Sequence, residues 1–181
     1  MKKLTTFTIA LALTGSFISN DLQAASRMEV DARIKEAITN FYALTSAGKE
    51  LAEKSVGMLV FPKVTKAGIG IGGERGNGAL LVDGETIDYY TTTSASVGLQ
   101  LGGQTRSQII LFMTREALES FQNSIGWEVG VDASVALATI GTGGELDTEV
   151  AKEPVIGFIF GNKGLMYNLS LEGSKISKSR K

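Results

Sequence analysis

Carboxylates are the main candidates for acid–base chemistry in this 181-residue sequence, because it contains no histidine and no cysteine. A Ser-His-Asp arrangement, a thiolate nucleophile, a disulfide and the commonest zinc sites are therefore excluded. Glu128 and Asp132 stand beside Trp127, the one tryptophan. Positions 128 and 132 of an extended strand share one face, so these two carboxylates could form an acid–base pair. We favour a solvated strand face instead, and we predict no catalytic residue and no metal ligand.

A glycine-rich stretch from Gly68 to Gly73 fits the pattern G-x-G-x-x-G, and Asp88 follows twenty residues after Gly68. In dinucleotide-binding proteins a helix opens at these glycines, so that its N-terminus holds the pyrophosphate. Here residues 74–78 contain two more glycines and an asparagine, which is typical of a turn that leads into another strand. The sequence therefore predicts strand glycines pressed against another backbone or placed at a bulge, and no nucleotide and no cofactor.

Basic side chains at the ends of predicted strands form the other candidate site. The chain as a whole is not basic, with 18 Lys and Arg against 19 Asp and Glu, which argues against a nucleic-acid partner. Each cation near an anionic membrane contributes on the order of 1 kcal/mol to the free energy of binding. Residues 173–181 contain four bases and no acid. The headgroup candidates, chosen by charge and position, are Lys63, Lys66, Arg75, Arg106 and Lys163. Charges that only keep the chain soluble are the alternative interpretation.

Residues 1–24 are typical of a secretory signal peptide. Two lysines precede an uncharged run, residues 4–18, and small residues follow near Ala24. The uncharged run is shorter than a comfortable membrane span. We predict cleavage after Ala24, or alternatively after Ala25, and a periplasmic product that is soluble or peripherally associated with a membrane. An uncleaved anchor is the other possibility.

Helical signal concentrates between residues 26 and 55. Apolar residues recur there with the spacing i, i+4, i+7, i+8 and i+11, which is one stripe of a helix. The members of this stripe are Val30, Ile34, Ala37, Ile38 and Phe41. We expect the stripe to pack on the domain, because the polar face carries acids as well as bases, whereas a helix lying on a membrane favours bases. A second short helix is predicted at about 47–54.

From residue 56 to about 178 the pattern predicts strands. A first strand, 57–61, is expected to end at Pro62, and Asp83-Gly84 predicts a hairpin turn. The apolar runs 109–113 and 155–160 predict central strands, whereas 97–101 and 165–171 alternate. One internal helix, 115–122, is predicted after an N-cap at Thr114. The expected fold is one α+β domain, residues 25–181, with a mainly antiparallel, strongly curved or barrel-like sheet.

Several ordered blocks of the sequence resemble the SYLF lipid-binding domain family. The blocks comprise residues 60–68, 72–78, 89–90, 96–102, 126–136 and 161–173. The resemblance spans about 46–176, and the chain is similar to the exported bacterial branch. It implies non-enzymatic phospholipid binding. Eukaryotic relatives bind phosphoinositides and some engage actin, but in the periplasm of a bacterium the resemblance implies anionic bacterial phospholipids as the partner.

Two alternatives to lipid binding stay open at this point. The first is a structural or interaction module of the periplasm that binds no lipid, in which the basic residues serve solubility. The second is a carboxylate-dependent hydrolase that uses Glu128 and Asp132.

Overall fold

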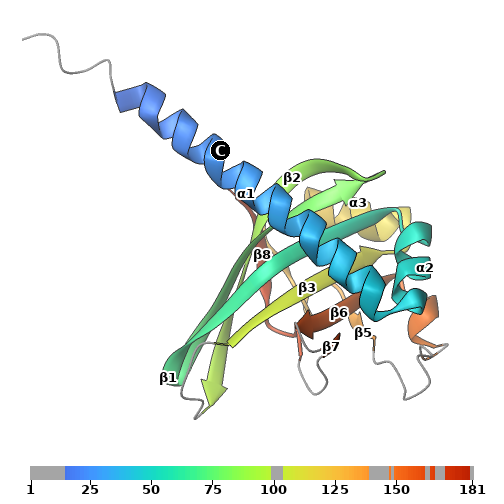
Figure 1. Ribbon diagram of the computed structural model, residues 1–181. Coiled ribbons are helices and arrows are strands. Elements are labelled where there is room, and N and C mark those ends of the chain that lie inside the picture. The colour runs from blue at the N-terminus through green and yellow to red at the C-terminus, as the bar shows by residue number, and fades with distance from the viewer. Residues whose placement is uncertain are drawn as a thin grey trace, which may run out of the picture.

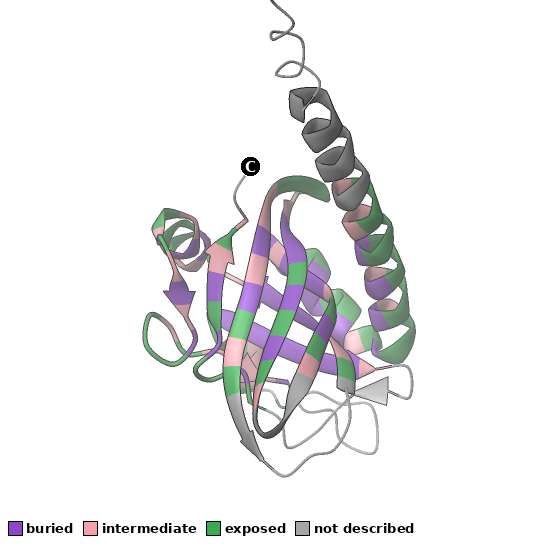
Figure 2. Ribbon diagram, turned by 90° about the vertical axis from the view of Figure 1, so that its left-hand side faces the viewer, coloured by how far each residue is buried: buried purple, intermediate pink, exposed green. Residues whose placement is uncertain are grey.

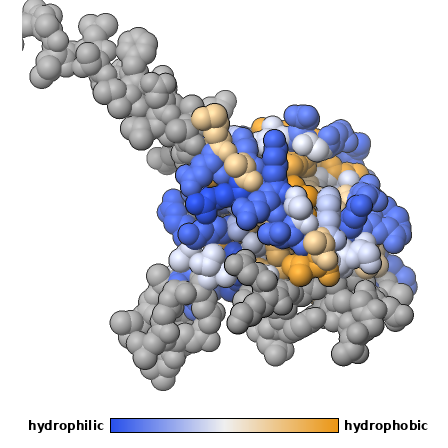
Figure 3. Space-filling model, viewed as in Figure 1, coloured by the Kyte–Doolittle hydropathy of each residue, from blue (hydrophilic) through white to orange (hydrophobic). Residues whose placement is uncertain are grey.

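The computed structural model describes residues 15–98, 104–138, 147, 149–161, 164–165 and 170–179. Helix α1 (Gly15–Leu44) crosses one face of a curved sheet (Figure 1). The predicted apolar stripe is confirmed, because Ile34, Ala37 and Phe41 are buried against that sheet. The face of the molecule on which α1 lies is mainly hydrophilic, with smaller apolar areas between the polar residues (Figure 3).

Helix α2 (Ser46–Lys54) confirms the second predicted helix. Thr45 caps it, because its hydroxyl oxygen accepts a hydrogen bond from the Gly48 amide at 3.0 Å. Gly48 is buried against the ring of Phe41, where a Cβ would lie 2.6 Å from Cζ. This contact brings α2 against α1, so the two helices cover the sheet as one layer.

Within the described residues, eight strands form one sheet in the order β4-β8-β2-β1-β3-β6-β5, with β7 beside β6. All pairs are antiparallel except β5 with β6. The strands are β1 (Gly57–Val82), β2 (Glu85–Gly98), β3 (Gln104–Phe112), β4 (Trp127–Glu128), β5 (Ala136–Leu137), β6 (Val155–Gly161), β7 (Gly164–Leu165) and β8 (Lys175–Lys178). The predicted α+β class with a mainly antiparallel, curved sheet is confirmed.

Two features of the predicted strands are confirmed and one is wrong. The β1–β2 turn has positive φ angles at Asp83 (52°) and Gly84 (81°), as a two-residue hairpin requires. The predicted apolar runs are buried on both faces over residues 109–112 of β3 and 155–160 of β6, which makes these parts of the sheet central. Pro62 does not end the first strand: β1 continues to Val82, and Pro62 lies at the register shift between Phe61 and Val64. A bulge accommodates the missing N–H of proline without ending the strand.

Strand β1 doubles back on itself. Its first half pairs with β3 and its second half pairs with β2. A Cβ at Gly78 would lie only 2.1 Å from the carbonyl oxygen of Val60. An extended run between these residues would span about 60 Å, so the chain must reverse direction between them. Residues 68–73 lie within β1 without a helix opening after them, as predicted. The close approach to a backbone occurs instead at Gly78, in the stretch 74–78 that was predicted as a turn and is part of β1.

The sheet separates two hydrophobic cores. The α1-side core contains Ile34, Ala37, Phe41, Leu51, Val60, Ile109, Leu111, Ile156, Phe158 and Phe160. The α3-side core contains Leu59, Phe61, Val64, Leu80, Tyr90, Ile110, Phe112, Leu118, Phe121, Trp127 and Ile176. Helix α3 (Arg115–Asn123) confirms the predicted internal helix, with Thr114 as its N-cap. Along the strands at the front of Figure 2, buried and exposed residues alternate, as expected where one face of a sheet packs on a core and the other faces solvent.

Two predicted strands fall largely outside the described residues. Of 97–101 only the first two positions are described, at the end of β2, and of 165–171 only positions 165, 170 and 171. A short 3-10 helix (Val150–Lys152) precedes β6. In the described part of the chain, no helix is both long and apolar enough to span a membrane.

Candidate functional site

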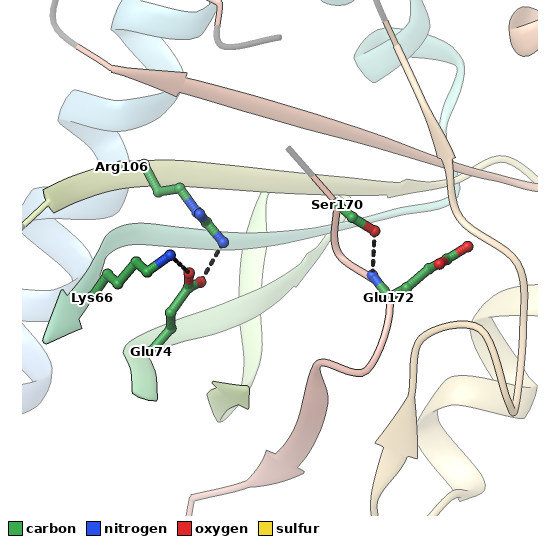
Figure 4. A network of polar contacts seen from close by, with 5 residues as sticks. All are labelled: Lys66, Glu74, Arg106, Ser170 and Glu172. Carbon is green, nitrogen blue, oxygen red and sulfur yellow. Dashed lines mark hydrogen bonds and ion pairs between the residues drawn. The ribbon is translucent and has the colours of Figure 1, made fainter. Parts of the chain in front are cut away.

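Three charged side chains meet on the α3 side of the sheet (Figure 4). Arg106 of β3 donates a hydrogen bond from Nη2 to Oε2 of Glu74 in β1. Lys66, in the other half of β1, places Nζ 4.0 Å from Oε1 of the same carboxylate. Two of the predicted headgroup candidates are thus brought together, and they share one carboxylate that the sequence analysis did not consider.

Strand alternation explains why these three side chains point to one face. Side chains an even number of residues apart in a strand lie on the same side of the sheet. By this rule Glu74 shares a face with Leu80, Lys66 with Val64, and Arg106 with Ile110. These three apolar residues all belong to the α3-side core. Because β1 doubles back, both of its halves contribute to the cluster. The charges therefore continue the α3-side core toward the end of the sheet at which Lys66 pairs with Gln104.

The cluster is largely shielded from water. The exposed fractions of the side chains are 8% for Glu74, 10% for Arg106 and 24% for Lys66. Two cations therefore share one carboxylate, which leaves one positive charge in excess where water is scarce. An uncompensated charge is costly in such surroundings, so the cluster favours the approach of a further anion.

A neutral side chain fixes the orientation of the guanidinium group. Gln108 is buried next to Arg106 on the same face of β3. With the amide turned so that its oxygen faces the guanidinium group, it accepts hydrogen bonds from Nε at 3.1 Å and from Nη2 at 3.2 Å. The neighbouring Ser107 hydroxyl donates to the carbonyl oxygen of Pro62 at 2.9 Å, which ties β3 to the bulge of β1. Arg106 is thus positioned before any ligand arrives.

An open depression of about 460 Å³ lies next to the cluster on the β2 side. Its lining includes Gly73, which directly precedes Glu74, and Ser94 of β2, which pairs with Glu74. Lys175 of β8 and Glu128 of β4 also line it. In the loop before β8, which appears in the same view, the Ser170 hydroxyl oxygen accepts a hydrogen bond from the Glu172 amide at 3.0 Å (Figure 4).

A larger depression of about 830 Å³ lies between α1, α2 and the β1–β2 turn. Its charged lining residues are Asp31, Lys35, Glu53, Asp83 and Glu85. Four carboxylates against one amine repel anions, so this depression does not suit an anionic headgroup.

The remaining headgroup candidates do not join the cluster. Arg75 follows Glu74 directly and is exposed on the opposite face of the sheet. Lys63 is also exposed and borders a small depression with Glu29 and Arg33 of α1. Lys163 lies outside the described residues. The structure therefore divides the candidates into a shielded pair, Lys66 and Arg106, and exposed residues elsewhere.

The predicted carboxylate pair, Glu128 and Asp132, does not lie on one strand. Strand β4 ends at Glu128, and the chain then turns through Gly130, which has a φ of 88°. Asp132 Oδ2 accepts a hydrogen bond from the Glu128 amide at 2.6 Å, which stabilises this turn. The prediction of one shared strand face is wrong because the turn interrupts the alternation. In the described part of the chain, no group of three or more carboxylates is placed to hold a metal ion.

Glu74 and Gln108 were missed by the sequence analysis. Glu74 falls in the stretch 74–78 that was predicted as a turn, and Gln108 directly precedes the apolar run 109–113, so neither was expected to be buried. A buried carboxylate usually has a cationic partner. The spacing alone does not show which cation this is, since Arg106 lies on another strand.

A comparison with known protein families finds one family that the second half of the chain matches. Residues 93–181 match the family model described as Ysc84, Las17-binding protein actin regulator. Residues 93–181 therefore match the SYLF (Ysc84) domain family. The match covers the second part of β2 and everything after it, including Arg106, whereas Lys66 and Glu74 precede it. No curated protein matches the chain. SYLF domains are lipid-binding or actin-regulatory modules, so the family relationship supports a membrane as the kind of partner.

Proposed function

We propose that this SYLF domain binds anionic phospholipid without catalysing a reaction, as an exported protein of the bacterial envelope. The observation that carries the proposal is the excess of positive charge in the shielded cluster of Lys66, Arg106 and Glu74. A phosphodiester group offers the oxygen pair that a guanidinium group binds best. The family relationship supports the lipid as the source of that phosphate.

In this proposal the two groups of basic residues have different tasks. Lys66 and Arg106 contact the headgroup phosphate, because they are held in place and partly desolvated. The exposed Lys63 and Arg75 raise the attraction to an anionic surface over a longer range. Lys163 keeps its place as a candidate by its charge and position in the sequence. Apolar side chains next to the site take the contact with the acyl chains.

The proposed location follows from the predicted signal peptide. Helix α1 begins at Gly15 and passes through Ala24, after which we expect cleavage. The buried part of the apolar stripe begins at Ile34, so a chain that starts at Ala25 keeps every contact of the stripe. We therefore propose that the mature domain folds in the periplasm and meets the membrane there. Fractionation of cells with an antibody against the domain tests this location.

Vesicle flotation of residues 25–181 tests the proposed binding. Neutral phosphatidylcholine vesicles are compared with vesicles that also carry phosphatidylglycerol or cardiolipin, at low and high salt. We expect flotation with anionic lipid alone, weakened by salt, because exposed ionic contacts are screened. Flotation that ignores salt would point to apolar contacts instead of the cationic cluster. The absence of flotation in all conditions would contradict the proposal and favour an interaction module that binds no lipid.

A further inference from the structure

We infer that Glu74 is an intramolecular counter-ion that occupies the place of the ligand phosphate, so that an anionic ligand binds Lys66 and Arg106 by displacing its carboxylate. The inference rests on the proposed function and adds that competition by the Glu74 carboxylate sets the affinity of the site for an anion. Its evidence lies in the contacts of the carboxylate.

The contacts of Glu74 are those that a phosphate would make. One carboxylate oxygen accepts from Arg106 Nη2 and the other faces Lys66 Nζ. Carboxylates and phosphates both present two oxygens to a guanidinium group in this way. A phosphate at the same place would put a second negative charge within a few ångströms of Glu74, and such repulsion is strong where water is scarce. Binding of phosphate therefore requires the carboxylate to withdraw.

The structure also gives Glu74 a way to withdraw. Among the residues that the structure describes, Arg106 is the one hydrogen-bond donor to this carboxylate, and Lys66 is at the limit of an ion pair at 4.0 Å. The open depression beside Gly73 and Ser94 offers space on the β2 side.

The inference makes a prediction opposite to that of a structural ion pair. If Glu74 competes with the ligand, removing its charge raises the affinity of the domain for anionic lipid. If Glu74 only holds Arg106 in place, the same change lowers the affinity or leaves it unchanged. Glu74→Gln keeps the size and an acceptor oxygen, whereas Glu74→Asp keeps the charge on a shorter side chain. We expect the two variants to differ in the size of the gain.

The experiment titrates phosphatidylglycerol vesicles into wild type, Glu74→Gln, Glu74→Asp and a matched control, Glu85→Gln. Glu85 is exposed at the start of β2, and its change alters the net charge equally. We expect half-binding of Glu74→Gln at an about tenfold lower lipid concentration, the effect of one interaction of moderate strength. Glu74→Asp should show a smaller gain, and the control should stay within about twofold of wild type.

A second experiment with soluble anions distinguishes a lipid headgroup from free phosphate as the ligand. Glycerol phosphate and inorganic phosphate are titrated into the same proteins, and the thermal unfolding temperature is recorded with and without each anion. We expect the unfolding temperature of Glu74→Gln to rise more with phosphate than that of wild type, since ligands stabilise the form that binds them. If Glu74→Gln does not fold, Glu74→Asp carries both experiments.

The possible outcomes distinguish a failure of the counter-ion role of Glu74 from a failure of the proposed lipid binding. If wild type binds vesicles and Glu74→Gln binds equally or more weakly, the counter-ion role is wrong and lipid binding stands. An equal gain in Glu85→Gln would also overturn the role, because net charge alone would explain it. If no protein binds vesicles, the proposed function fails. A gain for soluble phosphate without a gain for vesicles would identify free phosphate as the ligand and overturn the lipid source.

Discussion

Gly78 lies so close to Val60 that no side chain fits between the two halves of β1. A Cβ at Gly78 would approach the Val60 carbonyl oxygen to 2.1 Å and the ring of Phe61 to 2.6 Å. Because the obstacle is mainly backbone, it cannot turn aside as a flexible side chain would. The doubling back of β1, which brings Lys66 to Glu74, therefore depends on a glycine at this position.

Gly78→Ala should destabilise the domain by about 3 kcal/mol or prevent folding, since overpacking against backbone forces the two halves apart. Urea unfolding followed by tryptophan fluorescence measures the change, because Trp127 is buried in the α3-side core. Gly73→Ala is the matched control, since a Cβ there meets only the Ser94 carbonyl oxygen at 3.7 Å. Equal stability of the two variants would contradict the close approach.

Arg106→Met should cost about 3 kcal/mol of unfolding free energy, because it leaves the Glu74 carboxylate shielded from water with only the distant Lys66. The double variant Arg106→Met/Glu74→Gln should recover part of this loss, since the unpaired charge is then gone. Urea unfolding of the four proteins gives the coupling energy, which we expect at about 1–3 kcal/mol. Additive losses would show that the two side chains act independently.

The exposed bases on the α1 side should contribute attraction and no specific contact. Lys63→Glu/Arg75→Glu should weaken binding to phosphatidylglycerol vesicles about tenfold at low salt, and much less at high salt. The matched control is Lys49→Glu/Lys54→Glu, which makes the same charge change on α2, where both lysines are paired with glutamates. An equal effect of both double variants would show that only the net charge of the domain matters.

Alkaline pH should destabilise the domain. Burial raises the pKa of Tyr42, Tyr89 and Tyr90, and the Asp31 carboxylate that accepts from the Tyr89 hydroxyl raises the pKa of Tyr89 further. A tyrosine with a raised pKa in the folded state binds its proton more tightly there than in the unfolded state. Its stabilising contribution is complete below about pH 10, the unfolded value, and is lost as the pH rises through the folded pKa.

Unfolding temperatures between pH 8 and pH 11 measure this loss of stability, with the ultraviolet absorbance of tyrosinate as a parallel signal. Tyr89→Phe should lower the alkaline sensitivity, because it removes one of the three hydroxyl groups. A flat stability profile up to pH 11 would contradict the assignment.

The parts of the fold that were predicted correctly depend on local patterns. The stripe of α1, the Thr114 cap of α3 and the Asp83-Gly84 turn are each decided by residues a few positions apart. The second half of β3 and strand β6 could be predicted as central because residues 109–112 and 155–160 are apolar on both faces. In these elements the local sequence and the tertiary structure favour the same conformation.

The parts that were missed depend on contacts between distant residues. Nothing near Pro62 shows that β3 pairs across the bulge and carries the strand onward. The pair of Arg106 with Glu74 joins positions 32 residues apart, and no periodicity links them. The turn after Glu128 depends on the Asp132 carboxylate and on the positive φ of Gly130, both of which are compatible with the alternation that predicted a strand.

The order of the sheet also bears on how the chain is made. Strand β8, residues 175–178, lies between β2 and β4, so these strands cannot complete the sheet before β8 has been synthesised. Until β8 arrives, β2 keeps one edge unpaired, and an unpaired strand edge is a template for pairing with another chain.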